Sequence, residues 1–172
     1  MRFPALATAL GCALAVPSAA LGEPWAVLDP MQTSRAYLGA AGPAGSATLY
    51  AVGGWNGTGG GILATMRSLD PNFGVWQVRR SMRVARKGLS AVALKGLIYA
   101  IGGDNGSATN AVESYNPSSN TWTRMRDMPT ARSRMAAAAV GSTIYVIGGA
   151  SGTAFLDVVE AYDTLTDTWW SR

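Results

Sequence analysis

The chain has 172 residues, no histidine, a single cysteine and a formal net charge of +4. Without histidine, a serine-type catalytic triad lacks its base, and the usual zinc, copper and haem sites lack their ligands, so we expect no metal and no cofactor. The positive charge is small and dispersed, which argues against nucleic acid as a partner.

Residues 1–22 have the pattern of a cleavable leader. One arginine at position 2 precedes an apolar stretch from Phe3 to Val16, and small residues follow from Pro17 to Gly22. This order is typical of a secretory signal peptide. The apolar stretch is shorter than the about 20 residues that cross a bilayer, and no second such stretch follows, so we expect no membrane span.

The one cysteine, Cys12, lies inside this leader. Cleavage after residue 22 would leave residues 23–172 without thiol or disulfide chemistry. We therefore expect a mature chain that is secreted or periplasmic. The run Ala9-Leu10-Gly11-Cys12 also resembles a bacterial lipobox, but its leucine is displaced by one position, so lipid anchoring is the weaker alternative.

The rest of the chain contains an internal repeat. Apolar runs end in glycine pairs at 53–54, 102–103 and 148–149, with steps of 49 and 46 residues (102 − 53 and 148 − 102). Tryptophans keep the same period at 76, 122 and 169, after an irregular first step from 25. The tryptophans at 25, 76 and 122 are each followed by a methionine and then an arginine at constant spacing. Several markers in one register indicate tandem structural units.

Each unit divides into short apolar runs separated by turn residues, a pattern that is typical of antiparallel strands. In the middle unit we expect strands over 88–94, 97–101, 111–115 and 121–126. Lys95-Gly96 is predicted to form a tight hairpin turn, and the stretch from Asn116 to Asn120 to turn the third strand into the fourth. We expect the tryptophans to pack one unit against the next.

These units resemble the kelch repeat family. The motifs that carry the resemblance are the Tyr-x-x-Gly-Gly runs, the seven-residue step from tyrosine to tryptophan, Glu113-Ser114-Tyr115-Asn116-Pro117, Glu160-Ala161-Tyr162-Asp163 and Met128-Pro129-Thr130-Ala131-Arg132. The resemblance covers residues 25 to 172. It implies an all-β fold, a partial kelch-type β-propeller over 23–172, with about three four-stranded antiparallel blades at about 25–75, 76–121 and 122–172.

The first unit departs from the family pattern. Arg67 stands where the other units have glutamate, Leu69 stands where they have tyrosine, and a glycine- and alanine-rich run over 39–45 replaces a regular inner strand. We therefore expect irregular geometry in the first blade. Since propeller rings have four to eight blades, three blades cannot close. The chain is then either a fragment of a larger ring or half of a homodimer that completes a six-bladed one.

Two pairs of charged residues recur at fixed repeat positions. Glu113 matches Glu160, and Arg86 matches Arg132. This recurrence favours a structural role, with pairing across strands, over a paired-carboxylate active site.

One end of the blades is the candidate binding surface. In up-and-down blades, the loop between the second and third strands emerges at the same end as the segment that enters the next blade. That end carries two basic clusters, which suit an acidic peptide or an anionic sugar. Arg134 is the strongest candidate because Gly88 and Tyr37 stand at the equivalent positions. The candidate binding residues are Arg86, Arg132, Arg134, Asn56, Asp104 and Asn105, and no catalytic residue is assigned.

Two functions are compatible with this sequence. The kelch resemblance implies an exported binding module that docks a protein or glycan ligand on its loops without catalysis. The alternative is an enzyme similar to the exported kelch mutarotases that interconvert the anomers of sialic acid, in which an arginine holds the carboxylate and an acidic residue moves the proton. We favour the binding module, because a mutarotase needs a closed central pocket and three blades supply one only as a dimer.

Overall fold

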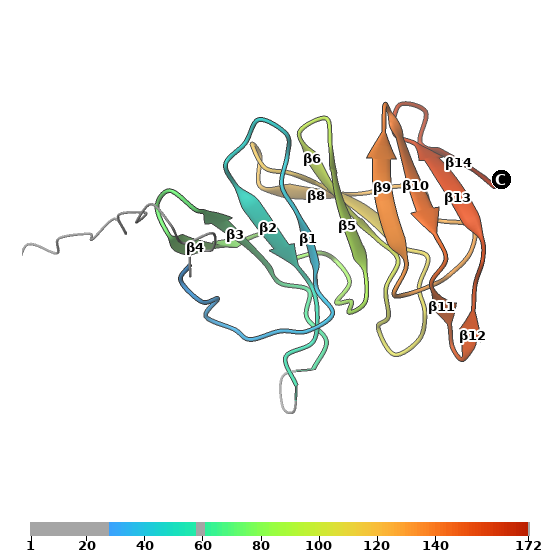
Figure 1. Cartoon of the computed structure of the whole chain (residues 1–172), viewed down its shortest axis with the longest axis horizontal. Helices are drawn as coiled ribbons and strands as arrows, with labels where there is room; N and C mark the ends of the chain where they lie inside the picture. Colours follow the sequence, from blue (N-terminus) through green and yellow to red (C-terminus); the bar gives the residue numbers. More distant parts are fainter. Residues whose placement is uncertain (1–27, 58–60, 172) are drawn as a thin grey trace, which may run out of the picture.

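The computed structural model describes residues 28–57 and 61–171. The leader expected at 1–22 lies outside the described residues. In the described part of the chain all regular structure is β-strand, arranged as three four-stranded antiparallel sheets and one two-stranded ribbon (Figure 1). This arrangement confirms the all-β class and the four-stranded units that the repeat predicts.

The sheets follow one another along the chain. The first sheet contains β1 (Gly39–Ala41), β2 (Leu49–Val52), β3 (Met66–Asp70) and β4 (Val75–Arg79). The second contains β5 (Ser90–Leu94), β6 (Leu97–Ile101), β7 (Val112–Asn116) and β8 (Thr121–Arg124). The third contains β9 (Ala136–Val140), β10 (Thr143–Ile147), β13 (Val159–Asp163) and β14 (Thr168–Ser171), and the ribbon pairs β11 (Ala150–Ser151) with β12 (Ala154–Phe155).

Two details differ from the sequence prediction. The blade boundaries expected at 75/76 and 121/122 fall inside the fourth strands of the first and second sheets. Each tryptophan therefore lies on the last strand of a sheet and does not begin the next one. The glycine-rich run also forms an inner strand, β1, which pairs with β2 in register. Its glycine has a packing reason, because a Cβ on Gly39 would lie 2.8 Å from the Cβ of Ala91 on the neighbouring β5.

The predicted hairpin between the first two strands of the middle unit is confirmed. Leu94 pairs with Leu97 across a two-residue turn. Both turn residues have left-handed backbones, with φ of 51° at Lys95 and 77° at Gly96. Left-handed geometry at both positions is that of the turns that match the twist of the flanking strands, which fixes the register of β5 against β6.

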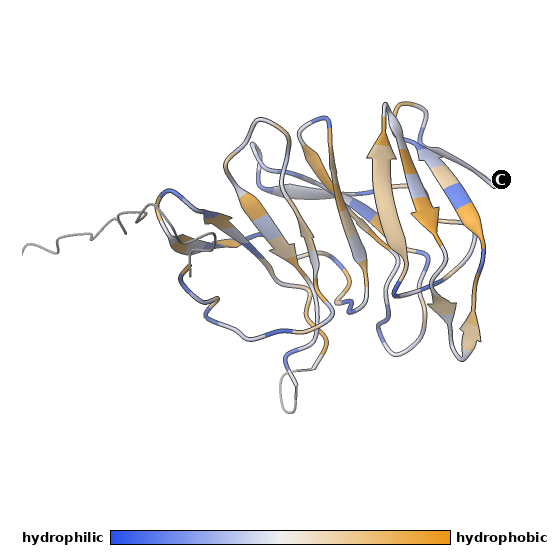
Figure 2. Ribbon diagram, in the orientation of Figure 1, coloured by the Kyte–Doolittle hydropathy of each residue, from blue (hydrophilic) through white to orange (hydrophobic). Residues whose placement is uncertain are grey.

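The core lies between adjacent sheets. One cluster joins the first sheet to the second and contains Tyr50, Val52, Met66, Met82, Leu89, Ile98, Ala100, Tyr115 and Trp122. A second joins the second sheet to the third and contains Val92, Tyr99, Ile101, Val112, Met128, Met135, Ile144, Val146 and Tyr162. Figure 2 shows the hydrophobic colouring along the strands and the hydrophilic colouring in the connecting loops. Burying one large apolar side chain contributes about 1.5–3 kcal/mol, so these clusters bind the sheets into one body.

The periodic tryptophans have a further task. Each lies on the fourth strand of its sheet, and its indole N–H donates to a backbone carbonyl in the segment that enters the same sheet. These bonds are Trp76 to Asp29 (2.8 Å), Trp122 to Arg80 (2.7 Å) and Trp169 to Arg126 (2.9 Å). The tryptophan thus fastens the outermost strand to the incoming chain, which explains why it keeps the period of the repeat.

The inner strands β1, β5 and β9 run side by side along the molecule (Figure 1). Consequently the loops that follow β2, β6 and β10 emerge at one common end, the lower end in Figure 1, together with the segments that enter β5 and β9. We call this end, which comprises residues 34–37, 53–57, 82–88, 102–111, 128–134 and 148–158, the loop face. The described residues contain no helix that is long and apolar enough to cross a membrane.

Candidate functional site

Paired backbone hydrogen bonds hold the loop face in the same way in all three sheets. Each pair joins the segment entering the sheet to the loop after its second strand. The bridges are Ala36 with Trp55 (2.8 and 2.8 Å), Lys87 with Asp104 (3.0 and 2.8 Å) and Ser133 with Ala150 (2.9 and 2.8 Å). The loops therefore start from fixed backbone positions.

The residue after each bridge has a left-handed backbone. Its φ is 55° at Tyr37, 60° at Gly88 and 56° at Arg134. The N–H of Gly88 donates to the carbonyl of Tyr37, and the N–H of Arg134 donates to the carbonyl of Gly88, both at 2.7 Å. A left-handed backbone costs a residue with a Cβ about 1–3 kcal/mol. The bonds between successive sheets hold the side chains of Tyr37 and Arg134 in place despite that cost.

These residues surround a depression of about 240 Å³, which we call the loop-face pocket. Its lining consists of Tyr37, Trp55, Lys87, Gly88, Asp104, Ser133 and Arg134. The two aromatic rings are open to solvent, with 58% of Tyr37 and 37% of Trp55 exposed. The Lys87 ammonium lies 5.9 Å from the centre of the Trp55 ring, within the range of a cation–π contact.

The charges of the pocket are predominantly positive. Neither Lys87 nor Arg134 forms a salt bridge with any residue that the structure describes. The one carboxylate in the lining, Asp104, accepts a hydrogen bond from the N–H of Gly106 at 2.8 Å. The pocket therefore offers two unpaired cations beside two exposed aromatic rings. Across 28–57 and 61–171, no group of three or more Asp, Glu, His or Cys side chains could hold a metal ion.

The structure brings two of the predicted binding residues together in this pocket, Arg134 and Asp104. Asn56 lies beside it, in a shallow groove of about 290 Å³ that is also lined by Ser34, Arg35, Ala36, Trp55 and Gly57. Asn105 is exposed in the loop after β6 and does not line the pocket. The predicted set is therefore spread over the loop face and does not form one cluster.

Arg86 and Arg132 lie elsewhere. Their side chains are fully buried, and they pair with Glu113 (3.0 Å) and Glu160 (2.6 Å). Burial lowers the pKa of both arginines, and the paired glutamates partly oppose that change. The ion pairs agree with the structural role that the repeat indicates. Because neither guanidinium reaches solvent, the structure offers no direct contact between these two arginines and a ligand at the surface.

Sequence reasoning missed Tyr37 and Trp55 as members of the pocket. Both break the repeat, since Trp55 stands where the other units have Asp104 and Ala150, and Tyr37 stands where they have Gly88 and Arg134. The criterion that selected Arg134 would have found them. It was obscured because exposed aromatic residues in a repeat protein are usually taken for core positions.

Comparison with known proteins agrees with this architecture. The family model described as the KLHDC2/KLHL20/DRC7 Kelch-repeats domain matches residues 40–172. No curated protein matches the chain. The matched span includes all three four-stranded antiparallel sheets, apart from one residue of β1, and both buried glutamate–arginine pairs. The chain belongs to the kelch-repeat family, whose repeats form blades of a β-propeller.

Proposed function

We propose that the loop-face pocket of this chain binds an acidic segment of a partner protein. A kelch-repeat domain is a protein-interaction module on a β-propeller scaffold, and the pocket lies where such a scaffold presents its loops. The observation that carries the proposal is the juxtaposition of Lys87 and Arg134, both without a salt-bridge partner among the described residues, with the exposed rings of Tyr37 and Trp55.

The chemistry of the lining supports a carboxylate ligand. An arginine guanidinium donates paired hydrogen bonds to a carboxylate, and such charge-assisted bonds are stronger than neutral ones. The rings of Tyr37 and Trp55 add apolar contact area beside the cations. A carboxylated sugar carries the same anionic group, so a glycan ligand is the second source of this chemistry.

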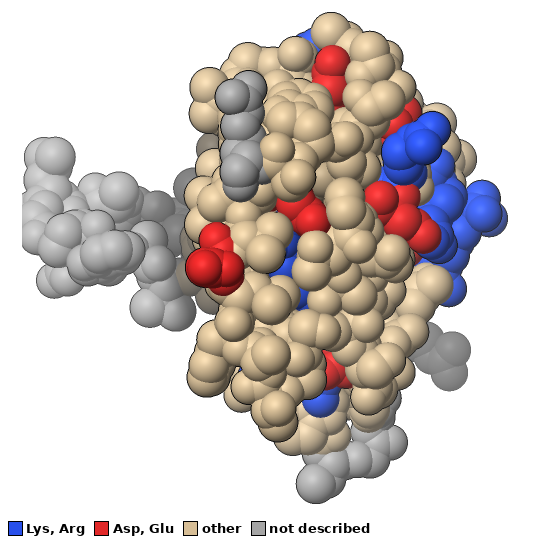
Figure 3. All heavy atoms as spheres, turned by 90° about the vertical axis from the view of Figure 1, so that its right-hand side faces the viewer, with Lys and Arg blue, Asp and Glu red and all other residues tan. Residues whose placement is uncertain are grey.

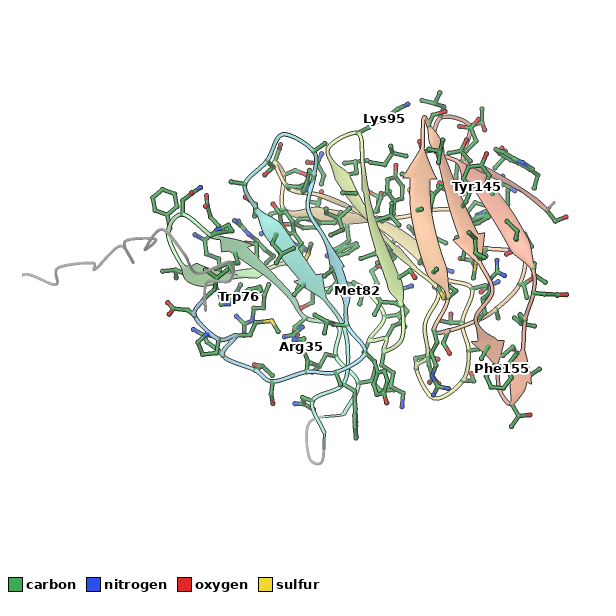
Figure 4. The ribbon with its side chains drawn as sticks, in the orientation of Figure 1. Arg35, Trp76, Met82, Lys95, Tyr145 and Phe155 are labelled. Carbon is green, nitrogen blue, oxygen red and sulfur yellow. The ribbon has the colours of Figure 1, made fainter. Side chains whose placement is uncertain are left out.

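Binding is tested best with matched substitutions at two left-handed positions. Arg134→Asn removes the guanidinium from the pocket, and Lys95→Asn removes a cation from the opposite end of the sheets, where Figure 4 labels Lys95. Asparagine tolerates a left-handed backbone, so both variants should fold. We expect Arg134→Asn to weaken binding of an acidic peptide about ten- to hundredfold and Lys95→Asn to leave it unchanged.

Fluorescence anisotropy with a labelled Asp- and Glu-rich peptide measures both affinities, with a Ser- and Gly-rich peptide as the negative probe. Titration with free sialic acid tests the glycan source. Equal peptide affinities for Arg134→Asn and the unaltered chain would contradict the proposal. Binding of sialic acid without binding of the peptide would identify a glycan ligand in place of a protein.

The mutarotase alternative has one supporting observation, the presence of a carboxylate, Asp104, beside Arg134 in the pocket. Glu113 and Glu160 are buried in ion pairs, so neither is open to a substrate. Anomer exchange of sialic acid, followed by NMR with and without the protein, decides between the two functions. Exchange at the rate of buffer alone would leave the binding module as the function.

The proposal extends to export. In residues 1–22, Arg2 is followed by an apolar stretch and then by small residues. This pattern supports cleavage before Glu23, with the mature chain secreted or periplasmic. N-terminal sequencing of the chain recovered from a secreting host should begin at Glu23. Recovery of the uncleaved chain inside the cell would contradict export.

A further inference from the structure

In the first blade, as in the other two, an arginine of the entering segment bonds to backbone carbonyls of the blade, but its acidic partner is replaced. Arg35 takes the place of Arg86 and Arg132. Its Nη1 donates to the carbonyls of Gly53 (3.0 Å) and Thr65 (3.1 Å). Arg86 Nη1 donates likewise to the carbonyls of Gly102 (2.9 Å) and Ala111 (2.7 Å). The repeat arginine of the first blade is therefore anchored by the same backbone groups.

The carboxylate that should face Arg35 is replaced by a second guanidinium. Arg67 pairs with Ala51 across β2 and β3, in the register in which Glu113 pairs with Ala100 across β6 and β7. With no glutamate at this position, Arg35 Nη2 donates to the hydroxyl of Thr65 at 3.2 Å. The first blade thus holds two cations where each of the other blades holds an ion pair.

Three side-chain nitrogen atoms of this arginine pair, Arg35 and Arg67, are buried without an acceptor. They are Nε of Arg35 and Nε and Nη1 of Arg67, none of which is bonded within the described structure. Nε of Arg86 is also unbonded, so the two nitrogens of Arg67 are what distinguish the first blade. Buried donors without an acceptor are rare in folded proteins. Burial lowers the pKa of Arg35, and the positive charge of Arg67 lowers it further.

The other blades show what an anion does at this position. Glu113 accepts hydrogen bonds from Arg86 Nη2 and from the backbone N–H of Arg83, both at 3.0 Å. Glu160 accepts them from Arg132 Nη2 and from the hydroxyl of Thr130, both at 2.6 Å. The carboxylate on the third strand therefore ties the repeat arginine and the rest of its entering segment to the sheet.

We propose that the arginine pair binds a small exogenous oxyanion, a carboxylate, sulfate or phosphate, in place of the missing glutamate. Arg35 also lines the shallow groove with Ser34 and Asn56, so the anion would reach the pair from the Arg35 side; Arg67 does not line this groove. Figure 4 shows Arg35 below the first sheet, toward the loop face. The site uses neither Lys87 nor Arg134, although its groove shares Trp55 with the loop-face pocket.

Thermal unfolding of the full chain tests the site. Sodium sulfate, phosphate and acetate are each compared with sodium chloride at equal ionic strength. We expect at least one oxyanion to raise the Tm by about 3 °C or more over chloride, since a ligand that binds only the folded state stabilises it. Isothermal titration with the same salts should give one site per chain, and the ranking of tetrahedral against planar anions identifies the class.

Arg67→Glu restores the ion pair of the other blades. We expect this variant to have a higher Tm than the unaltered chain in chloride and no additional response to the oxyanion. Arg80→Glu makes the same change of charge at an exposed position and should keep the response, as should Arg134→Asn. Arg67→Gln, which removes the second cation without supplying an anion, serves if Arg67→Glu does not fold, and it should also lose the response.

Two results would overturn the site. One is an unaltered chain whose Tm is the same in oxyanion and chloride. The other is an oxyanion response of equal size in Arg67→Glu or Arg67→Gln. A response that disappears only in Arg134→Asn would place the anion in the loop-face pocket, and would leave the peptide proposal standing while refuting this one.

Discussion

Arg132 and Arg134 stand close together in the segment that enters the third blade, yet only Arg134 reaches solvent. Arg132 recurs in every unit, and its guanidinium bonds inside the blade. Arg134 has no charged counterpart in the other units, and it lines the loop-face pocket. In the second and third blades the ion pair closes the repeat arginine off from a ligand, whereas Arg134, which breaks the repeat, is free to contact one.

The tyrosine of the third blade gives a test at the scale of one residue. Tyr162 donates a hydrogen bond to Asp167 at 2.6 Å. Burial, then this hydrogen bond and the charge of Asp167, raise the pKa of Tyr162. The folded state therefore holds the phenolic proton more tightly than the unfolded state. The resulting stability is complete below about pH 10, the unfolded pKa, and is lost as the pH rises toward the folded pKa.

We expect Tyr162→Phe to lower the Tm at pH 7 by a few degrees, because a hydrogen bond worth about 1 kcal/mol is lost. The same variant should show a shallower decline of Tm above about pH 10 than the unaltered chain. Circular dichroism melts across this range measure both effects. Tyr37→Phe, at an exposed tyrosine of the loop face, is the control, and an equal change in slope for both variants would contradict the assignment.

At the scale of elements, the glycine pairs allow the backbone after the second strand to pack closely against the segment that enters the next sheet. Gly102 has φ of 56°, and a Cβ there would lie 2.6 Å from the carbonyl oxygen of Arg132 and overlap the methyl group of Met135. Gly141 has a similar φ of 62°, but its Cβ would meet open space. The two positions separate the cost of backbone conformation from the cost of packing.

Alanine substitutions at these glycines should differ in their effect on the free energy of unfolding. Gly141→Ala carries the left-handed penalty alone, about 1–2 kcal/mol. Gly102→Ala adds overpacking of about 1–3 kcal/mol. Urea denaturation of both variants measures the difference. Equal destabilisation would mean that the segment around Arg132 and Met135 moves to make room for the added methyl group. That result would contradict the close packing at Gly102.

At the scale of the whole molecule, the outer flank of the third sheet differs from those of the first two. Val52 and Ile101 are completely buried beneath the next sheet, whereas Ile147 at the same position is 48% exposed. Figure 3 faces this flank and shows mostly uncharged surface, with separate acidic side chains across it and a group of basic side chains along one edge. Figure 4 labels Tyr145, which shares the face with Ile147. Among the described residues nothing covers this apolar face.

The homodimer expected from the sequence stays a prediction, and this flank is where a second copy would pack. Size exclusion with light scattering on residues 23–172 should give the mass of a dimer if two copies complete a ring. Val140→Asp, on the exposed flank, should shift the mass toward the monomer. Leu165→Asp, at a comparably exposed residue in the turn between β13 and β14, should not. A monomer at all concentrations would contradict the dimer and favour a fragment of a larger ring.

Local sequence determined the elements. Alternating apolar residues, the Lys95-Gly96 turn and the recurring glycine pairs predicted the four-stranded units, because strand and turn preferences act over a few neighbouring residues. The repeat also identified the glutamate–arginine pairs as structural and Arg134 as a candidate for binding. It placed the blade boundaries too early, because pairing partners and not the tryptophan period decide which sheet β4 and β8 join.

Only the tertiary structure decided which of these residues meet. The pocket takes residues from the segments around 37, 88 and 134, which are distant in sequence and adjacent only because the inner strands run side by side. Arg86 and Arg132 are buried and therefore absent from the surface. The register of β2 against β3 puts Arg67 at the position where the other blades have glutamate, so that Arg35 faces a second cation. Exposure, charge pairing and cavities depend on distances between segments, and a linear repeat specifies the segments without those distances.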